Sequence, residues 1–290
     1  MQLLLEQLLN GLAVGSIYAL ITLGLALVYG IMRILHVAHA AMYTVGAYMG
    51  LWLYGQTGTL WLAIPGSMVI CALLGVAIER FVYFPLLKFP PYVPLISSIA
   101  LFLGLEELCR LVAGAELRTF PPQLRLPFPS LRLGSVVISS ESLAVYAVTA
   151  SVLILLWIVT TKTEFGLTMR AASQDMEVAS SLGVNSHWVV DAVFVIGSAI
   201  AAVAGVLVGI YYNQVYPTMG AVPAYKSLAL IVVGGMGSAP GAVLASLLLG
   251  VGETLLIGFA NIPMPRDALA FIAMIVVLLW KPEGILGRSR

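Results

Sequence analysis

Long apolar runs, separated by short polar intervals, make up most of the chain. Nine runs of about 13 to 24 residues follow one another, and a helix needs about 20 residues to cross a bilayer core roughly 30 Å thick. The pattern predicts an all-α fold, a polytopic helical membrane protein with about nine spans and a single domain over residues 1–290. The runs lie near residues 5–28, 37–52, 62–81, 93–112, 143–159, 188–211, 221–233, 241–259 and 268–280.

Two polar intervals are long enough to fold outside the apolar body. Residues 113–140 contain several prolines ahead of a β-prone stretch from Leu131 to Ile138, which indicates an external loop. Residues 164–185 contain no Gly or Pro between Thr168 and Leu182, and Gly183 stands where a left-handed C-terminal cap is expected. We therefore predict one helix here, capped at Thr163 or Glu164 and ending at Gly183.

Small side chains follow one face of this predicted helix. Ala171, Asp175, Ala179 and Leu182 recur at i, i+4, i+8 and i+11 and therefore share a face. Such a face buries too little apolar area to hold a helix on lipid, at roughly 25 cal/mol per Å². It does allow another protein to approach closely, although a solvated loop helix without a partner has the same pattern.

Composition excludes several classes of protein. With 61% hydrophobic and only 9% charged residues, the chain lacks the charge that a water-facing surface requires. A net charge of +1 gives no basic face for nucleic acid. No phosphate-binding Gly-Lys-Ser/Thr loop, His-Glu-x-x-His or Gly-x-Ser-x-Gly motif occurs, so we expect neither an enzyme nor a bound cofactor.

Glycine-rich breaks mark a candidate solute path. The run 221–233 would be about 20 Å long at 1.5 Å per residue, less than the bilayer core. It ends in a segment that contains Gly234, Gly235, Gly237 and Ser238, and the first run ends similarly at Gly30. Interrupted segments at matching places in two halves indicate the solute path of a transporter. We therefore predict a break within the membrane after each run.

Three ionisable residues fall in or beside apolar runs. Glu253 would cost about 2.5–3.5 kcal/mol if it faced lipid at the bilayer centre, so we expect it to face protein or water. A role in the solute path and a structural anchor are both open for it. His36 and His39 would be i, i+3 neighbours if this segment were helical, but no Cys, Asp or Glu lies close in sequence. We therefore expect no metal site and hydrogen bonds to backbone instead.

The interval 164–185 resembles the cytoplasmic coupling loop in permease subunits of bacterial ABC importers for branched-chain amino acids. That loop reads Gly, three residues, Arg-Ala, three residues, Asp, three residues, Ala, three residues, Gly-Val/Ile-Asn/Asp. The resemblance implies that this helix docks into a groove on an ATP-hydrolysing subunit. The matching residues are Gly166, Arg170, Ala171, Asp175, Ala179, Gly183, Val184 and Asn185.

The resemblance extends along nearly the whole chain. It includes the glycine-rich segment 233–242, Glu253 and the closing segment 281–288. The chain departs from the family pattern at His36, Val37, Ala40 and Ala41. The opening signature and the later matches are Tyr18, Gly24, Tyr29, Gly30, His39, Gly46, Ala47, Tyr48, Pro217, Gly220 and Lys226.

The resemblance implies a multi-pass permease in the bacterial inner membrane, with residues 164–185 in the cytoplasm and loop 113–140 facing an external solute-binding protein. It implies two ATP-binding subunits and a second permease, since an ATPase dimer offers two grooves and this chain offers one helix. A urea or short-amide permease, and an ion-coupled carrier or channel without ATPase, are the alternatives. The expected path for an amino-acid solute consists of His36, His39, Gly234, Gly235, Gly237, Ser238 and Glu253.

Overall fold

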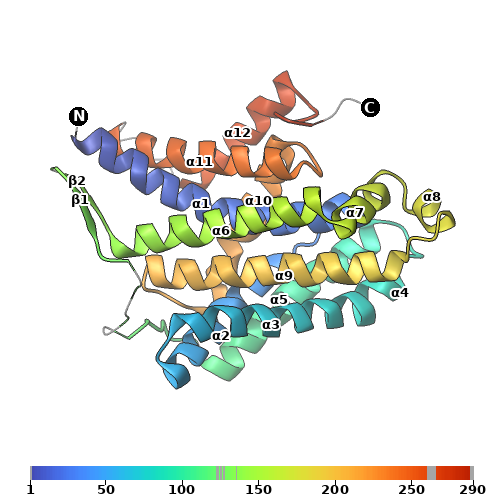
Figure 1. Ribbon diagram of the computed structural model, residues 1–290, viewed down its shortest axis with the longest axis horizontal. Coiled ribbons are helices and arrows are strands. Elements are labelled where there is room, and N and C mark those ends of the chain that lie inside the picture. Colours follow the sequence, from blue (N-terminus) through green and yellow to red (C-terminus); the bar gives the residue numbers. More distant parts are fainter. Residues whose placement is uncertain are drawn as a thin grey trace.

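The computed structural model describes residues 2–121, 124, 126, 128–134, 136–259 and 266–287 and shows an elongated helical bundle (Figure 1). Each of the nine predicted apolar runs forms a helix. This confirms the all-α fold for the described residues, whose only named strands form one short hairpin. The helices are α1 (Gln2–Met32), α2 (His39–Thr57), α3 (Leu60–Ile78), α5 (Tyr92–Ala113), α6 (Ser140–Lys162), α9 (Ser186–Tyr211), α10 (Ala221–Gly234), α11 (Ala239–Phe259) and α12 (Arg266–Trp280).

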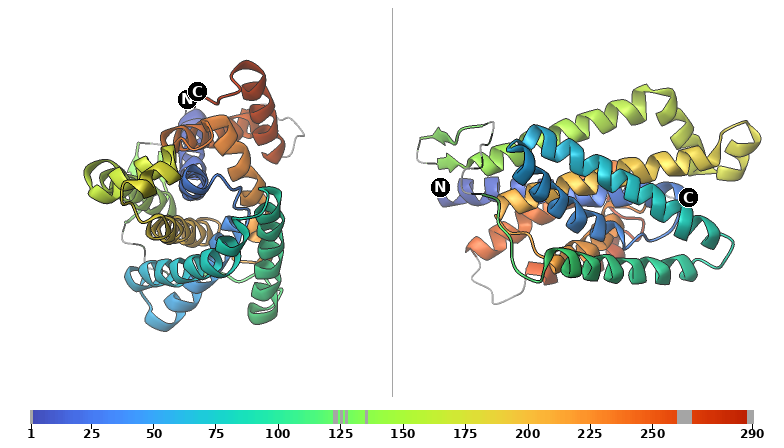
Figure 2. Two further views of the ribbon diagram at one scale, coloured as in Figure 1. Left: turned by 90° about the vertical axis from the view of Figure 1, so that its right-hand side faces the viewer. Right: turned by 90° about the horizontal axis from the view of Figure 1, so that it is seen from below.

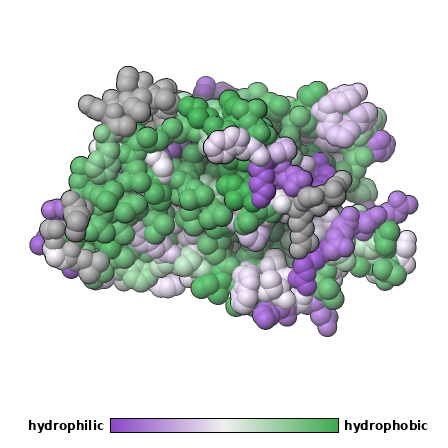
Figure 3. Space-filling model, turned by 90° about the horizontal axis from the view of Figure 1, so that it is seen from above, coloured by the Kyte–Doolittle hydropathy of each residue, from purple (hydrophilic) through white to green (hydrophobic). Residues whose placement is uncertain are grey.

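Five segments of the described chain are long and apolar enough to cross a membrane. The number of nine spans therefore stays a prediction. Hydrophobic side chains cover the middle of the surface seen in Figure 3, and hydrophilic ones gather toward its ends, as expected for a protein surrounded by lipid. The five segments are Gln2–Met32, Leu60–Leu86, Ser140–Lys162, Ser186–Tyr211 and Ala239–Phe259.

Helix α1 forms the centre of the bundle and packs against α6, α9, α10 and α11 (Figure 2). Glycines let its backbone touch that of its neighbours. A Cβ atom built on Gly11 would lie 2.7 Å from the Cα of Val251 in α11, and one built on Gly24 would lie 2.9 Å from the carbonyl oxygen of Gly197 in α9. Close backbone contact through small residues is the usual packing mode of membrane helices.

The two ends of the bundle differ. One end, called here the α7–α8 end, has α7 (Glu164–Gln174), α8 (Met176–Ser181), the π-helical η1 (Glu79–Tyr83) and α4 (Phe84–Leu86). The opposite end, called the hairpin end, has the start of α1 and an antiparallel pair of strands, β1 (Leu131–Leu133) and β2 (Val136–Ile138) (Figure 1). The hairpin confirms the β-prone stretch that the sequence predicts.

The loop at the hairpin end is attached to the connection between α9 and α10. Arg118 and Val215 exchange two backbone hydrogen bonds of 2.8 Å. The backbone N–H of Phe120 donates to Oδ1 of Asn213 at 3.0 Å, and the Phe120 ring is buried. These contacts fix the loop against the segment that leads into the 3₁₀ helix η2 (Pro217–Gly220).

The prediction of one continuous helix up to Gly183 is wrong, because the chain breaks at Asp175, with φ −154° and ψ 109°. The Oδ1 atom of Asp175 accepts hydrogen bonds from the backbone N–H groups of Glu177 at 2.9 Å and Val178 at 3.0 Å. A short acidic side chain competes in this way with the helix and caps the next one. Gly183 ends α8 with φ 93°, which confirms the predicted left-handed cap.

The structure has a helix end at both predicted breaks. Helix α10 ends at Gly234, and helix α1 ends at Met32, two residues beyond Gly30. The two breaks lie side by side at the α7–α8 end, where a Cβ on Gly237 would be 3.6 Å from the Cα of Gly30. Helix α10 is short because η2 precedes it at Pro217–Gly220 and the glycine-rich turn follows it after Gly234.

Candidate functional site

A buried ion pair and a tyrosine hydroxyl connect three helices of the bundle. The Nζ atom of Lys226 in α10 lies 2.8 Å from Oε1 of Glu253 in α11, and both side chains are 2% exposed. The hydroxyl of Tyr18 in α1 accepts a hydrogen bond from Lys226 at 2.8 Å and donates one to Oε2 of Glu253 at 3.1 Å. Pairing and hydrogen bonding offset the desolvation of both charges.

The burial of Glu253 confirms that it faces protein and not lipid. Its partner Lys226 was not among the predicted path residues. The sequence does contain a signal for this pair, because Lys226 and Glu253 lie in consecutive apolar runs. Two opposite charges buried in such runs have to neutralise each other. Spacing along the chain does not reveal that Tyr18 completes the cluster.

A cavity of about 340 Å³ adjoins this cluster. Residues of α1, α2, α9, η2 and α10 form its walls, together with the connection that follows α9 at the hairpin end. Lys226 is its one charged lining residue, four tyrosines line it, and most of the remaining side chains are apolar. The lining residues are Val14, Ile17, Tyr18, Ile21, Tyr43, Val208, Tyr212, Gln214, Tyr216, Met219, Val222, Pro223 and Lys226.

A packed apolar layer separates this cavity from the α7–α8 end. Leu25 and Ala26 of α1 pack with Ile231 of α10 and Ala242 of α11, and all four are at most 2% exposed. These residues lie further along α1 and α10 than the cavity residues do. The cavity is therefore closed in that direction by side chains of the same helices that line it.

The two predicted histidines lie outside this cavity. The Nδ1 atom of His36 shares a hydrogen bond of 2.6 Å with the Tyr83 hydroxyl, so its partner is a side chain and not the predicted backbone group. His39 starts α2 and packs against Gly24, where a Cβ would lie 2.6 Å from Nε2 of the ring. The described part of the chain contains no group of three or more His, Cys, Asp or Glu residues suited to a metal.

The glycine-rich turn also lies away from Glu253, against the C-terminal segment. The N–H groups of Ile285 and Leu286 donate to the carbonyls of Val233 at 2.8 Å and Gly234 at 3.1 Å. Carbonyls at the end of α10, which have no partner within the helix, are satisfied in this way. Ser238 accepts a hydrogen bond from the N–H of Gly241 at 3.2 Å. The structure therefore gives this turn a structural role at the α7–α8 end.

Helix α7 is attached to three parts of the bundle. The Arg33 guanidinium, at the end of α1, donates to the backbone carbonyl of Ser173 at 3.0 Å. The Arg170 guanidinium donates to the carbonyl of Thr160 in α6. The rings of Phe165 and Trp188 in α9 meet edge to face, with centroids 5.2 Å apart. A displacement of α7 would therefore act directly on α1, α6 and α9.

The inner face of α7 is packed closely. Gly166 lies against the carbonyls of Val159 and Thr160, which leave no room for a side chain, and Met169 and Ala172 are buried. This arrangement explains the glycine at the corner between α6 and α7. The sequence predicts that Ala171 and Ala179 share one face. In the structure they differ, because Ala171 is exposed whereas Ala179 is buried.

The remaining predicted coupling residues hold the segment in shape. Asp175 caps α8, Gly183 ends it, and the Oδ1 atom of Asn185 accepts a hydrogen bond from the N–H of Trp188 at 3.2 Å and so caps α9. Exposed apolar side chains, Leu167, Val178 and Leu182, project from the two helices.

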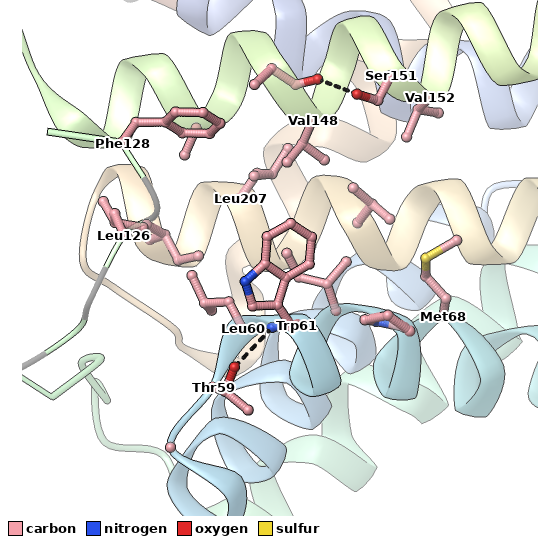
Figure 4. Close-up of a pocket in the computed structure, with 17 residues that line it drawn as sticks. Thr59, Leu60, Trp61, Met68, Leu126, Phe128, Val148, Ser151, Val152 and Leu207 are labelled. Atoms are coloured by element: carbon pink, nitrogen blue, oxygen red, sulfur yellow. Dashed lines mark hydrogen bonds between the residues drawn. The ribbon is translucent and has the colours of Figure 1, made fainter. Parts of the chain in front are cut away.

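A second cavity, of about 560 Å³, lies between α3, α6 and α9 (Figure 4). No charged residue lines it, and the hydroxyl of Ser151 at its wall donates to the Ala147 carbonyl of its own helix at 2.7 Å. Figure 4 shows Trp61, Met68, Leu207 and other apolar side chains around the space. This cavity suits an apolar occupant and offers no partner for a charged solute.

Several helical segments long and apolar enough to cross a membrane place the chain in the class of polytopic membrane proteins. The chain belongs to the family of permease components of branched-chain amino acid transport systems, whose family model matches residues 7–278. The relatives of this chain are named as transport permeases and not as enzymes.

Three relatives illustrate the similarity. The high-affinity branched-chain amino acid transport system permease protein BraD of Pseudomonas aeruginosa is 35% identical over 98% of this chain and 96% of its own length. The permease protein LivH of Escherichia coli is 34% identical over the same shares of the two chains. The permease protein LivM of Escherichia coli is 25% identical over 94% of this chain and 68% of its own.

Replacement of Lys226 by Met would leave the Glu253 carboxylate buried without its cation. We expect the free energy of unfolding to fall by about 3–5 kcal/mol, measured by thermal unfolding of the purified protein in detergent. The double substitution Lys226→Met with Glu253→Gln removes both charges and should restore most of the loss. Equal destabilisation by the single and the double change would contradict the pairing.

Replacement of Gly235 by Ala should release the C-terminal segment. Gly235 has φ 106°, and a Cβ there would lie 2.7 Å from the Cα of Gly287. We expect faster hydrogen exchange at the amides of Ile285 and Leu286, measured by mass spectrometry. Gly252→Ala is the control, because a Cβ at Gly252 meets no atom within 4 Å. Unchanged exchange in Gly235→Ala would show that the segment is held by other contacts.

Proposed function

We propose that the chain is the membrane-spanning permease subunit of an ATP-driven ABC importer for branched-chain or other hydrophobic amino acids in the bacterial inner membrane. The observation that carries this proposal is the match to the permease family along nearly the whole chain, with relatives named for branched-chain amino acid transport. The exposed apolar residues of α7 and α8 support a soluble partner at that end.

The proposed coupling runs from α7 to the cavity. An ATP-binding subunit docks on α7 and α8 at the cytoplasmic side, and its closure displaces α7. Arg33 transmits the displacement to α1, and the Phe165–Trp188 contact transmits it to α9. Both α1 and α9 line the cavity beside Lys226. Helix α1 also supplies Leu25 and Ala26 to the apolar layer between the cavity and the α7–α8 end. Displacement of these helices opens the layer toward the cytoplasm.

The importer would contain two ATP-binding subunits and a second, similar permease. The similarity of this chain to both LivH and LivM supports pairing between related permeases. At the opposite end, the loop 113–140 with its β hairpin would meet the external solute-binding protein. The loop is attached to the connection after α9, so a binding protein docked there would lie next to residues that line the cavity.

The alternative functions have less support. The names of the relatives favour amino acids over urea or short amides. Exposed Leu167, Val178 and Leu182 on α7 and α8 favour a partner over a carrier or channel that acts alone. The direct test is uptake of leucine by liposomes that contain the permease pair, the ATP-binding subunits and the binding protein. Uptake that does not depend on ATP would contradict the proposal.

Replacement of Ala171 by Trp should block docking of the ATP-binding subunit, because Ala171 is exposed on α7 and a large ring there prevents close approach. We expect the ATP-binding subunits to be lost on affinity purification and uptake of leucine to stop. Ala150→Trp, at an exposed position of α6, is the matched control and should change neither. Normal uptake by a stably expressed Ala171→Trp variant would refute the docking role.

Replacement of Asp175 by Ala removes the cap of α8 and should destabilise this helix by about 0.5–2 kcal/mol. We expect ATP hydrolysis to continue while less solute is moved per ATP, measured as the ratio of uptake to phosphate release. Asp175→Asn preserves the capping oxygen and should keep the ratio. If Asn were as harmful as Ala, the charge of Asp175 would act on the partner and not on α8.

A further inference from the structure

The cavity of about 340 Å³ presents a buried cation to any molecule inside it. Lys226 lines the wall with only 2% of its side chain exposed. The hydroxyl of Tyr18 and the carboxylate of Glu253, both within 2.8 Å of the ammonium, fix its position. A carboxylate that enters the cavity meets a cation that is already desolvated and held in place, so little further ordering is required on binding.

The charge balance of the cluster favours zwitterions. Lys226 and Glu253 together are neutral. A solute with one carboxylate and one ammonium group adds no net charge, whereas an anion or a cation would leave an uncompensated charge deep in an apolar bundle. A cavity beside this neutral pair would therefore discriminate among solutes by net charge.

The remaining walls fit the other two parts of an amino acid. Tyr43, Tyr212 and Tyr216 line the cavity, and aromatic rings can attract an ammonium group. Ile17 and Ile21 of α1 form an apolar wall with other aliphatic residues. The volume is at the small end of the roughly 300–1,000 Å³ typical of ligand sites, which fits a single small solute and excludes a peptide.

We propose that this cavity is a binding site within the permease for a small zwitterion with an apolar side chain, whose carboxylate binds Lys226 and whose side chain lies against Ile17 and Ile21. This proposal rests on the proposed import of amino acids. The site would select among solutes within the permease, after the external binding protein has released the solute. Tyr18 and Glu253 act as positioning residues, because they hold the ammonium and not the solute.

A matched pair of substitutions tests this site. Ile17→Ala enlarges the apolar wall, whereas Ile210→Ala enlarges the second cavity, between α3, α6 and α9; the two isoleucines are 3% and 4% exposed. The probes are radiolabelled valine and leucine, each supplied on the same saturated wild-type binding protein to liposomes that contain the whole importer. The quantity measured is the ratio of the initial uptake rates of leucine and valine.

We expect Ile17→Ala to raise the leucine-to-valine ratio by about tenfold, the lower end of what one methylene group is worth in an apolar site. Ile210→Ala should leave the ratio unchanged, although both substitutions remove the same atoms from the interior. Equal ratios in the two variants would overturn the site. Absence of ATP-dependent uptake in the wild-type importer would overturn the proposed function as well, so the two failures are distinguishable.

A second measurement addresses the charges. The double variant with Lys226→Met and Glu253→Gln stays neutral and is expected to fold, yet it has no cation for the carboxylate. Uptake of both amino acids should fall at least about tenfold, as is typical when a site loses its polar partner for the ligand, while the ATP-binding subunits still co-purify. Wild-type uptake by this variant would show that the pair is only a structural anchor.

Discussion

Burial of charge among apolar helices is the constraint on which the rest of the structure depends. Lys226 and Glu253 are tolerated because each neutralises the other and because Tyr18 supplies a further hydrogen bond to both. The three side chains come from α10, α11 and α1, so the cluster sets the relative positions of these helices. The same arrangement leaves a cation at the wall of the adjoining cavity.

Backbone contacts at glycines determine how the helices can move. Where Gly11 faces α11, no side chain lies between the backbones, and a Cβ atom would have to displace the neighbouring chain. At Gly24 a Cβ atom would meet both the His39 ring and the carbonyl of Gly197 in α9. Interfaces of this kind have discrete arrangements and do not deform continuously. A displacement of α7 would therefore move α1 and α9 as whole helices.

The apolar runs predicted the helices well because burial in lipid requires about 20 apolar residues regardless of the final packing. Gly183 was also predictable, since a local backbone conformation dictates glycine there. The break at Asp175 was not, because a stretch without Gly or Pro satisfies the helix pattern, and only the fold decides whether an aspartate points outward or caps a new helix.

The candidate site was predicted only in part. Glu253 was identified by its own cost of burial, whereas Lys226 and Tyr18 join it through contacts between residues far apart in the sequence. The glycines after α10 looked like part of the solute path because a short helix and a flexible segment are the usual signs of one. The structure shows a close packing contact at each: Gly235 meets the C-terminal segment, Gly234 meets Gly241, and Gly237 meets Gly30.

The arginine at the end of α1 binds main chain and not a side chain of α7. Arg33 has φ 57°, and its guanidinium donates to the carbonyl oxygen of Ser173. Every residue type carries that oxygen, so the sequence of α7 can vary without loss of this contact. Arg170 binds the carbonyl of Thr160 in the same manner. The attachment of α7 to α1 is therefore independent of the side chains that α7 exposes.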